Sequence, residues 1–172
     1  MNIRQEKPSD YQEVYNLIKI SFATNPDDDG TTPDYLNDIR NKDIFIPELS
    51  LVAEHESGAI IGQIVLYKTD ITTPDTTITQ LVLSPISVHP DYFGQGIARA
   101  MVEEALGLAK TMGYKAVFLC GHPPIYRKLG FTPTCDYGIY HVDDKDKTAQ
   151  WCMVRELETG ALKNINGSID CL

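Results

Sequence analysis

The stretch HPDYFGQGIARAMVEEALGLAKTMGY, from His89 to Tyr114, combines a Gly-x-Gly turn with a helical pattern. Gly94 and Gly96 stand between a strand-like run that ends at Val88 and a helix that begins near Ile97. Glycines let the backbone approach a ligand closely, and the first amides of a helix have no partners within it. Together with the helix dipole, these amides predict a site for a phosphate or another anion.

The helix after this turn has a clear apolar side. Apolar residues recur at Ile97, Met101, Ala105, Leu108 and Met112, with Ala98, Val102, Leu106 and Ala109 beside them. This spacing is typical of a helix that packs one face against a core. Gly113 is suited to end it in the left-handed conformation.

The spacing of the turn excludes two nucleotide-binding motifs. A dinucleotide fingerprint, G-x-G-x-x-G, requires a glycine where Arg99 stands, and no strand-helix-strand unit with a suitably placed acidic residue follows cleanly. A Walker A loop would need Gly-Lys-Ser/Thr, which the turn lacks. Taken alone, the turn is compatible both with an anion site and with a plain tight turn that starts a helix.

Helices and strands are expected on both sides of this stretch. A first helix is predicted at about 10–20 with Ser9 as its N-cap, and a second begins at Thr32 and Pro33. Two β-rich runs flank a turn at 56–58, and a third strand contains Pro85, which suggests a bulge or an edge. Later strands are expected at 116–120, 138–142 and 150–157, with a short helix after the first of them. The order predicts a mixed α/β domain.

The bulk composition limits the class of protein. A chain of 172 residues suits one domain, and no apolar run is long enough to cross a membrane. Because the net charge is -9, nonspecific nucleic-acid binding is not expected. The N-terminal residues show no secretion or transit signal, so a cytoplasmic location is expected. The cysteines lack CxxC spacing, and we expect Cys120, Cys135, Cys152 and Cys171 to be reduced thiols that bind no metal.

Four segments together resemble the GNAT superfamily of acyl-CoA N-acyltransferases. Three of them are PISVHPDYFGQGIARAMVEEAL (85–106), LCGHPPIYRKLGF (119–131), which is similar to an LG(D/H)PxYYxRFGF-like stretch of one branch, and the central hairpin LVAEHESGAIIGQIVLY (51–67). The fourth, WCMVRELETGAL (151–162), is similar to that branch's last strand and tail. The resemblance covers nearly the whole chain. It implies a mixed, mostly antiparallel central sheet flanked by helices, in a single N-acetyltransferase domain spanning residues 1–172.

The resemblance implies acetyl-CoA as cosubstrate. The family's R/Q-x-x-G-x-G/A motif, whose amides hold the CoA pyrophosphate, matches Phe93 to Ala98, except that Phe93 replaces the usual Arg or Gln. Because the main phosphate donors are amides, binding is expected to be reshaped rather than lost. The residues expected to contact acetyl-CoA are Ile86, Ser87, Val88, Phe93, Gly94, Gln95, Gly96, Ile97, Ala98, Arg99 and Tyr126.

The resemblance also implies direct acetyl transfer to a primary amine in a ternary complex. Tyr126 matches the tyrosine that protonates the departing thiolate, and the Val88 amide would stabilise the oxyanion. The strand before the turn carries no glutamate as a base, so water relayed through Gln80, Ser84 or Ser87 and the side chain of His122 are the candidates; Glu54 and His55 could also face the cleft. Tyr126 could instead only pack beside Phe131, and His122 could simply fill its turn.

Two other functions stay open at this level. A noncatalytic acyl-CoA-binding or sensing module would explain Phe93 and the missing glutamate, whereas a purely structural domain would bind no anion at the turn. Cys120 is not expected to carry the acyl group, because direct transfer needs no covalent intermediate. Edge strands near the C-terminus are compatible with a homodimer, and neither a nucleic-acid nor a membrane partner is expected.

Overall fold

The computed structural model describes residues 1–171 except 24 and 26–28. The chain forms two compact units, one of Met1–Tyr67 with Ser84–Leu108 and one of Lys68–Leu83 with Ala109–Leu172. We describe each unit by itself. Part of the connection between the first two helices lies outside the described residues.

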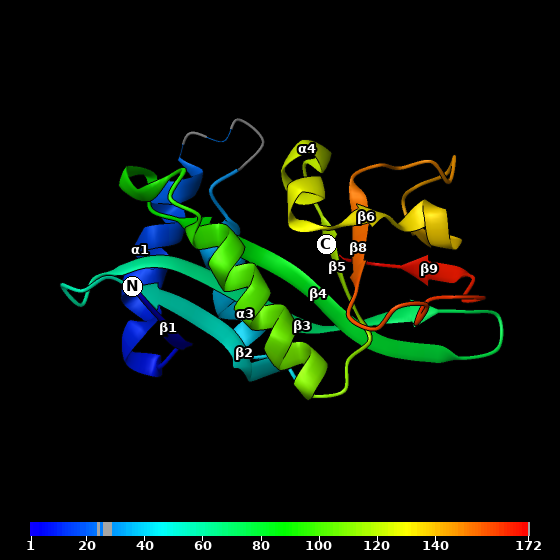
Figure 1. Cartoon of the computed structure of the whole chain (residues 1–172), viewed down its shortest axis with the longest axis horizontal. Coiled ribbons are helices and arrows are strands. Elements are labelled where there is room, and N and C mark those ends of the chain that lie inside the picture. The colour runs from blue at the N-terminus through cyan, green and yellow to red at the C-terminus, as the bar shows by residue number, and fades with distance from the viewer. Residues whose placement is uncertain (24, 26–28, 172) are drawn as a thin grey trace. The chain divides into compact units, whose positions relative to one another are not determined.

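Three antiparallel strands form the sheet of the first unit (Figure 1): β1 (Asn2–Gln5), β2 (Phe45–Glu54) and the first part of β3 (Ile60–Thr72). β2 and β3 are the predicted hairpin, and Gly58 in its turn has a φ of +88°. The end of β4 (Thr77–Val88) lies beside β3, because the amide of His89 donates to the carbonyl of Ile61 at 2.8 Å.

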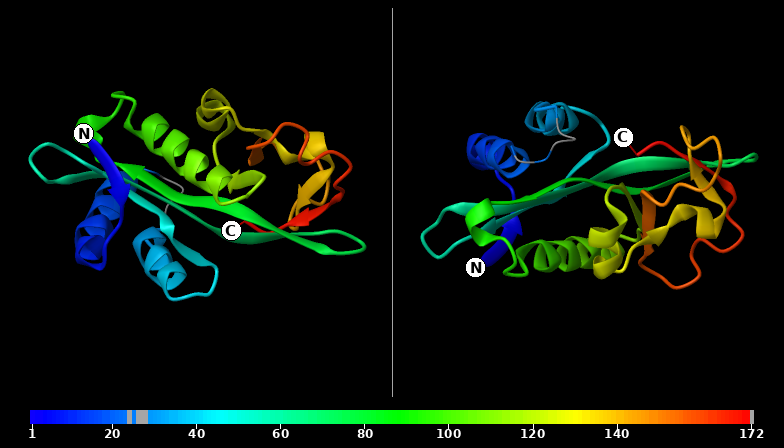
Figure 2. Two further views of the ribbon diagram at one scale, coloured as in Figure 1. Left: turned by 60° about the horizontal axis from the view of Figure 1, so that its bottom comes forward. Right: turned by 90° about the horizontal axis from the view of Figure 1, so that it is seen from above.

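Helices cover both faces of this sheet. α1 (Tyr11–Phe22) and α2 (Thr32–Arg40) lie on one face, and α3 (Ile97–Thr111) lies on the other (Figure 2). α3 approaches β3 closely at Gly62, where a Cβ would meet Met101 Cε at 2.8 Å and Ile97 Cγ2 at 3.2 Å. The apolar side predicted for α3 is therefore the face that packs against the sheet, except that Met112 follows the helix and is 45% exposed.

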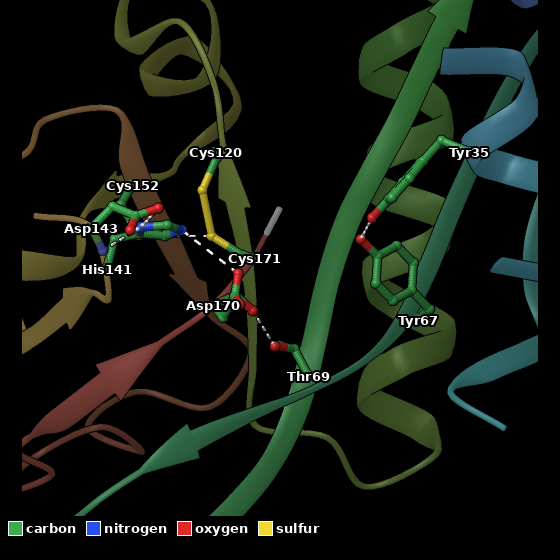
Figure 3. Close-up of a disulfide and its surroundings, with 9 residues drawn as sticks. All are labelled: Tyr35, Tyr67, Thr69, Cys120, His141, Asp143, Cys152, Asp170 and Cys171. Atoms are coloured by element: carbon green, nitrogen blue, oxygen red, sulfur yellow. Dashed lines mark hydrogen bonds and ion pairs between the residues drawn. A yellow bond between two sulfur atoms is a disulfide. The ribbon is translucent and has the colours of Figure 1, made fainter. Parts of the chain in front are cut away.

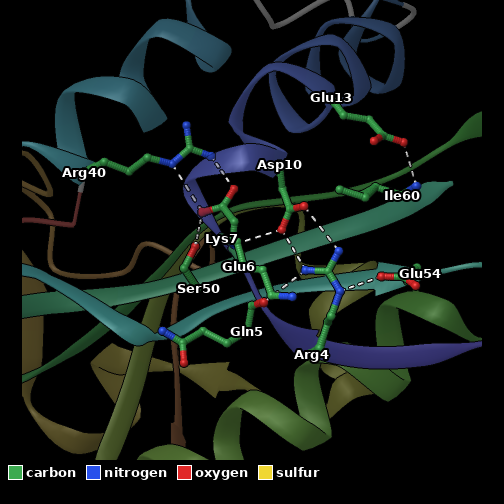
Figure 4. A network of polar contacts seen from close by, with 10 residues as sticks. All are labelled: Arg4, Gln5, Glu6, Lys7, Asp10, Glu13, Arg40, Ser50, Glu54 and Ile60. Carbon is green, nitrogen blue, oxygen red and sulfur yellow. Dashed lines mark hydrogen bonds and ion pairs between the residues drawn. The ribbon is translucent and has the colours of Figure 1, made fainter. Parts of the chain in front are cut away.

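A network of ion pairs fastens the N-terminal segment (Figure 4). Arg4 Nη1 contacts Asp10 Oδ2 at 2.7 Å, and its Nε donates to Glu54. The Asp10 carboxylate also accepts the Lys7 amide at 2.8 Å, so Asp10 rather than Ser9 caps this turn, and the predicted Ser9 cap is wrong. The Arg4 guanidinium lowers the pKa of Asp10.

A second ion pair that involves the N-terminal segment is buried. The Arg40 guanidinium, at the end of α2, pairs with the buried carboxylate of Glu6, which also accepts a hydrogen bond from Ser50 Oγ at 2.7 Å. A buried charge is tolerated only when it is paired and hydrogen-bonded. Arg40 therefore ties α2 to the N-terminal segment.

The strands of the second unit pair mostly antiparallel. β4 and β5 (Ala116–Cys120) are parallel, with Leu81 opposite Val117 and Val82 opposite Phe118. β5 pairs antiparallel with β8 (Cys152–Glu156), which pairs with the short β6 (Thr132–Pro133). β9 (Gly167–Ile169) pairs antiparallel with the end of β3 and parallel with β7 (Ile139–His141).

Helical segments of the second unit are short. α4 (Pro123–Tyr126) leads into a 3-10 turn at Arg127–Leu129, and another 3-10 turn spans Thr134–Tyr137. In the first unit, 3-10 turns span Pro8–Asp10 and Pro90–Tyr92.

The predicted mixed, mostly antiparallel sheet flanked by helices is confirmed. Two strands, β6 and β9, were not predicted, because Thr132–Pro133 and Gly167–Ile169 are too short to show an alternating pattern. Cys120 and Cys171 form a disulfide, so the expectation of four reduced thiols is wrong for these two, which β9 brings together from distant parts of the chain. No helix in the described part of the chain is long and apolar enough to span a membrane.

Candidate active site

The Gly-x-Gly turn has the backbone geometry that only glycine adopts readily. Gly94 has a φ of +76° and Gly96 a φ of +80°, and the amide of Ala100 donates to the Gly96 carbonyl at 3.0 Å, so the helical ladder starts there. A Cβ on either glycine would meet no atom within 4 Å, so both are required for their backbone conformation rather than for packing. The exposed turn thus presents the N-terminus of α3.

Phe93 lies at the start of this turn and is 57% exposed. Its amide donates to the Pro90 carbonyl at 3.1 Å, which closes the preceding 3-10 turn. Phe93 therefore offers a ring, and not an amide, to a ligand. Gln95 is exposed with its side-chain amide near the Asp91 carbonyl, and Arg99 is exposed on the first turn of α3.

Val88 ends β4 and is held by the first helix. Ser21 Oγ, at the C-terminal end of α1, donates to the Val88 carbonyl at 2.8 Å. The backbone amide of His89 donates to Ile61 of β3. Because successive residues of a strand direct their backbone groups to opposite edges, the Val88 amide points to the edge away from β3. The Val88 amide is therefore a hydrogen-bond donor that does not pair with β3, as the predicted oxyanion donor must be. Ser21 had no sequence signal, since its role depends on how α1 packs.

Two buried polar side chains lie close to Val88 along the sheet. The bond between His89 and Ile61 sets a register in which Ser87 is opposite Gln63, with both side chains on one face. Ser87 Oγ and Gln63 Nε2 are buried, and neither has a hydrogen-bond partner among the described residues. Buried polar groups are normally satisfied by protein, water or ligand, so this pair marks a polar spot inside the first unit. Gln63 was missed because alternation in β3 is obscured by continuous burial.

Other residues proposed for proton relay are engaged elsewhere. Gln80 Oε1 accepts the amides of Lys115 and Ala116 at 2.9 and 3.0 Å, so it holds the start of β5. Glu54 pairs with Arg4, and His55 Nδ1 contacts Ser57 Oγ at 2.9 Å within its own hairpin turn. These three side chains have structural partners, which removes them from the set of simple base candidates.

Tyr126 belongs to the second unit, where it ends α4. Its ring packs edge-on against Phe131 with centroids 6.0 Å apart, and burial raises the pKa of its hydroxyl. The ring also lies on Gly121, where a Cβ would overlap Tyr126 Cε2 and meet Cδ2 at 2.9 Å. Gly121 is therefore required by the position of the Tyr126 ring.

His122 is the other predicted site residue of the second unit. It precedes α4, and its carbonyl accepts the Ile125 amide at 3.0 Å. His122 is exposed, and its side chain makes no capping hydrogen bond. The backbone of His122 therefore starts α4, whichever role the imidazole has.

Comparison with known proteins identifies the family. Residues 2–134 match the family model described as "Acetyltransferase (GNAT) domain". The chain belongs to the GNAT acetyltransferase family. It is 28% identical to the protein named uncharacterized N-acetyltransferase YhbS of Escherichia coli K12, over 99% of this chain and 95% of YhbS. It is 27% identical to uncharacterized N-acetyltransferase YjhQ of the same organism, over 73% of this chain and 69% of YjhQ.

Solved structures of this GNAT family have the same fold. The crystal structure of Escherichia coli YhbS in complex with CoA superposes with a TM-score of 0.86 and 25% identity, covering 99% of this chain and 89% of that one. A GNAT acetyltransferase of Brucella melitensis in complex with acetyl-CoA has a TM-score of 0.77 and 21% identity, covering 98% and 94%. The second likeness concerns the fold alone.

Proposed function

We propose that this GNAT domain transfers an acetyl group from acetyl-CoA to a primary amine by direct transfer in a ternary complex. The observation that carries the proposal is the Gly94–Gly96 turn, in which two left-handed glycines present the N-terminus of α3. The YhbS structure, which holds CoA, supports the choice of cosubstrate. Membership of an acetyltransferase family favours transfer over a noncatalytic sensing module.

The turn and the first residues of α3 are proposed to hold the pyrophosphate. Amides of Gly94 to Arg99 would donate to phosphate oxygens, aided by the positive end of the helix dipole. The exposed Phe93 ring replaces the family's polar side chain and adds an apolar contact beside the turn. Backbone groups of Ile86 to Val88 would pair with the pantetheine arm as an added strand does.

The transfer itself needs an oxyanion donor and an acid. The neutral amine attacks the thioester carbonyl, a C–N bond forms, the oxygen becomes an oxyanion, and the C–S bond then breaks. The Val88 amide would donate to that oxygen, and a fixed donor of this kind contributes a few kcal/mol. Tyr126 would give its proton to the departing thiolate; because burial raises its pKa, it stays protonated until then.

A base must accept the proton that the amine loses. We propose a water molecule held by Ser87 and Gln63, whose buried polar atoms have no partner among the described residues. His122 is the second candidate, since the residue is exposed and its side chain makes no capping bond.

The setting of the enzyme is also a proposal. We propose that the whole chain, 1–172, acts as one catalytic domain in the cytoplasm, with neither a nucleic-acid nor a membrane partner. A homodimer through strands near the C-terminus stays a prediction, which light scattering on the purified protein tests.

Three measurements test the proposal. Calorimetric titration should show acetyl-CoA binding, and a screen of primary amines and peptides that measures free thiol should show turnover on some of them. Tyr126→Phe should lower kcat strongly while acetyl-CoA affinity stays near the wild-type value. Absence of binding by folded protein at millimolar acetyl-CoA would reject the cosubstrate; binding without turnover on any acceptor would favour the sensing module.

A further inference from the structure

Three cysteines from distant parts of the chain meet in the second unit (Figure 3). Cys120 ends β5, Cys152 begins β8 directly opposite it, and Cys171 follows β9. Their sulfur atoms all lie within 4.8 Å of one another. Cys120 and Cys171 form the disulfide, and Cys152 Sγ lies 3.9 Å from Cys171 Sγ. A free thiol therefore contacts one sulfur of an existing disulfide.

The three cysteine residues differ in exposure to solvent. Cys152 is fully buried and Cys171 is 3% exposed, whereas Cys120 is partly exposed. Burial raises the pKa of the Cys152 thiol, so it is protonated at neutral pH and attacks only when it loses that proton. A small thiol or disulfide in solution reaches Cys120 first.

We propose that Cys120, Cys152 and Cys171 form a thiol–disulfide exchange cluster in which Cys171 alternates between Cys120 and Cys152 as its partner. The Cys152 thiolate attacks Cys171 Sγ, the Cys152–Cys171 bond forms, and the Cys120–Cys171 bond breaks. Cys120 leaves as a thiolate and takes up a proton, so the exchange needs no oxidant. Forming the first disulfide from three thiols does need one, such as oxidised glutathione, which is reduced to two glutathione thiols.

The cluster holds the C-terminal segment of the second unit in place. Thr69 Oγ1 donates to the Asp170 carbonyl at 2.8 Å, and the Val142 amide donates to the Ile169 carbonyl at 3.0 Å. The disulfide adds a covalent link from the next residue, Cys171, to the end of β5. Reduction therefore removes one of several attachments and leaves the β9 pairing intact.

The same cluster adjoins a residue of the proposed reaction. Cys120 precedes Gly121, on which the Tyr126 ring packs. The redox state of Cys120 is thus linked to the position of Tyr126 through one peptide unit. This link to activity rests on the proposed function, whereas the exchange itself does not. In a cytosolic protein such disulfides are usually transient and redox-sensing.

A metal site is the competing explanation for three close cysteines. Its most obvious fourth ligand would be His141, which lies beside the cluster in Figure 3. His141 Nδ1 accepts the Asp143 amide at 3.1 Å, so the neutral ring carries its proton on Nε2, which then has no lone pair for a metal. Structural zinc takes four ligands. The exchange cluster explains the disulfide without one.

The chain is well suited to a direct test by peptide mapping. Wild-type protein is equilibrated in glutathione buffers of graded redox poise, quenched with acid, unfolded, and alkylated with N-ethylmaleimide before digestion. Trypsin then separates the four cysteines into the peptides 116–127, 129–145, 148–155 and 164–172. Mass spectrometry identifies which of these peptides are cross-linked, and elemental analysis of the undigested protein measures zinc and copper.

The proposal predicts two cross-links in wild-type protein under oxidising poise, 116–127 to 164–172 and 148–155 to 164–172. Cys152→Ser should lose the second and keep the first, and Cys120→Ser should do the reverse. Cys135→Ser is the matched control, because Cys135 lies outside the cluster, and it should leave the distribution unchanged.

Three results would overturn the proposal: a single 116–127 to 164–172 cross-link at every poise, only free thiols in oxidised glutathione, or stoichiometric metal bound by the wild type and lost in Cys152→Ser. None of these readouts uses activity. If mapping succeeds and no acceptor is ever acetylated, the proposed function fails while the exchange cluster stands.

Discussion

The side-chain hydroxyl of Ser21 donates a 2.8 Å hydrogen bond to the main-chain carbonyl of Val88. The bond joins the C-terminal end of α1 to the end of β4, just before the Gly-x-Gly turn. Since the carbonyl and amide of one strand residue point to the same edge, Ser21 also fixes the direction of the Val88 amide. A helix thereby positions the donor that we assign to the oxyanion.

Replacing this hydroxyl should affect turnover more than cosubstrate binding. Ser21→Ala removes one neutral hydrogen bond, worth about 1 kcal/mol, and we expect kcat/KM to fall about fivefold through kcat. Steady-state kinetics with saturating acetyl-CoA measures it. Ser57→Ala, the same change in an exposed hairpin turn, is the control. Unchanged kcat in Ser21→Ala would remove Ser21 as a positioning residue.

The two left-handed glycines of the turn allow a matched comparison with a third. Ala at Gly96 must adopt a φ near +80°, which costs about 1–2 kcal/mol. We expect Gly96→Ala to lower stability by that amount, or to shift the turn and weaken acetyl-CoA binding about tenfold. Gly160→Ala carries similar strain, at a φ of +79° in the turn after β8, and should leave affinity unchanged. Equal calorimetric affinity in both variants, at equal stability loss, would contradict the pyrophosphate assignment.

Local patterns predicted the elements of this fold well. The apolar period of α3, the hairpin around Gly58 and the β5 run at Ala116–Cys120 depend on neighbouring residues, so the sequence reveals them directly. β9 was missed because it is stabilised by pairing with β3 and β7 rather than by its own composition.

Of the candidate site residues, only those that belong to a sequence motif could be predicted. Gly94 and Gly96 are recognisable by spacing, and Tyr126 by its flanking residues. Ser21, Gln63 and the Cys120–Cys171 disulfide depend on contacts between segments remote in sequence, which periodicity does not encode.

The ion pair of Arg4 and Asp10 makes stability depend on pH. Because Arg4 lowers the pKa of Asp10, the folded state favours the ionised carboxylate. This stability is fully present above the ordinary carboxyl pKa of about 3.9 and is lost as pH falls through the lower folded value. Asp10→Asn should cost about 1.5–3 kcal/mol at neutral pH, and the difference from wild type should narrow only below about pH 4.

Urea unfolding from neutral to acidic pH measures this difference. Glu56→Gln, an exposed charge removal in the hairpin turn, serves as the control and should show little change. A difference between Asp10→Asn and wild type that is the same at every pH would contradict the assignment to ionised Asp10.

Gly121 tests whether the placement of the Tyr126 ring matters for catalysis. Ala at Gly121 would overlap the ring and displace it, so kcat should fall toward the level of Tyr126→Phe while acetyl-CoA affinity changes little. Gly107→Ala is the control: no atom lies within 4 Å of its Cβ, and Ala in a helix interior should add about 0.5–1 kcal/mol of stability. Full kcat in a folded Gly121→Ala protein would argue that Tyr126 is only a packing residue.

Two variants can decide whether the base is the water held by Ser87 or the imidazole of His122. Ser87 Oγ is buried and has no hydrogen-bond partner among the described residues, so Ser87→Ala should leave the free energy of unfolding unchanged or raise it. If Ser87 helps hold the water that accepts the amine proton, kcat should nevertheless fall at least about tenfold.

The comparison variant is His122→Ala, whose side chain makes no capping bond to the backbone of α4. We expect its kcat to stay within about twofold of wild type, because a base that does not take the proton contributes nothing to the step. Chemical denaturation and steady-state kinetics on both variants give the four values needed. A large loss of kcat in His122→Ala with full activity in Ser87→Ala would reverse the assignment and make the imidazole the base.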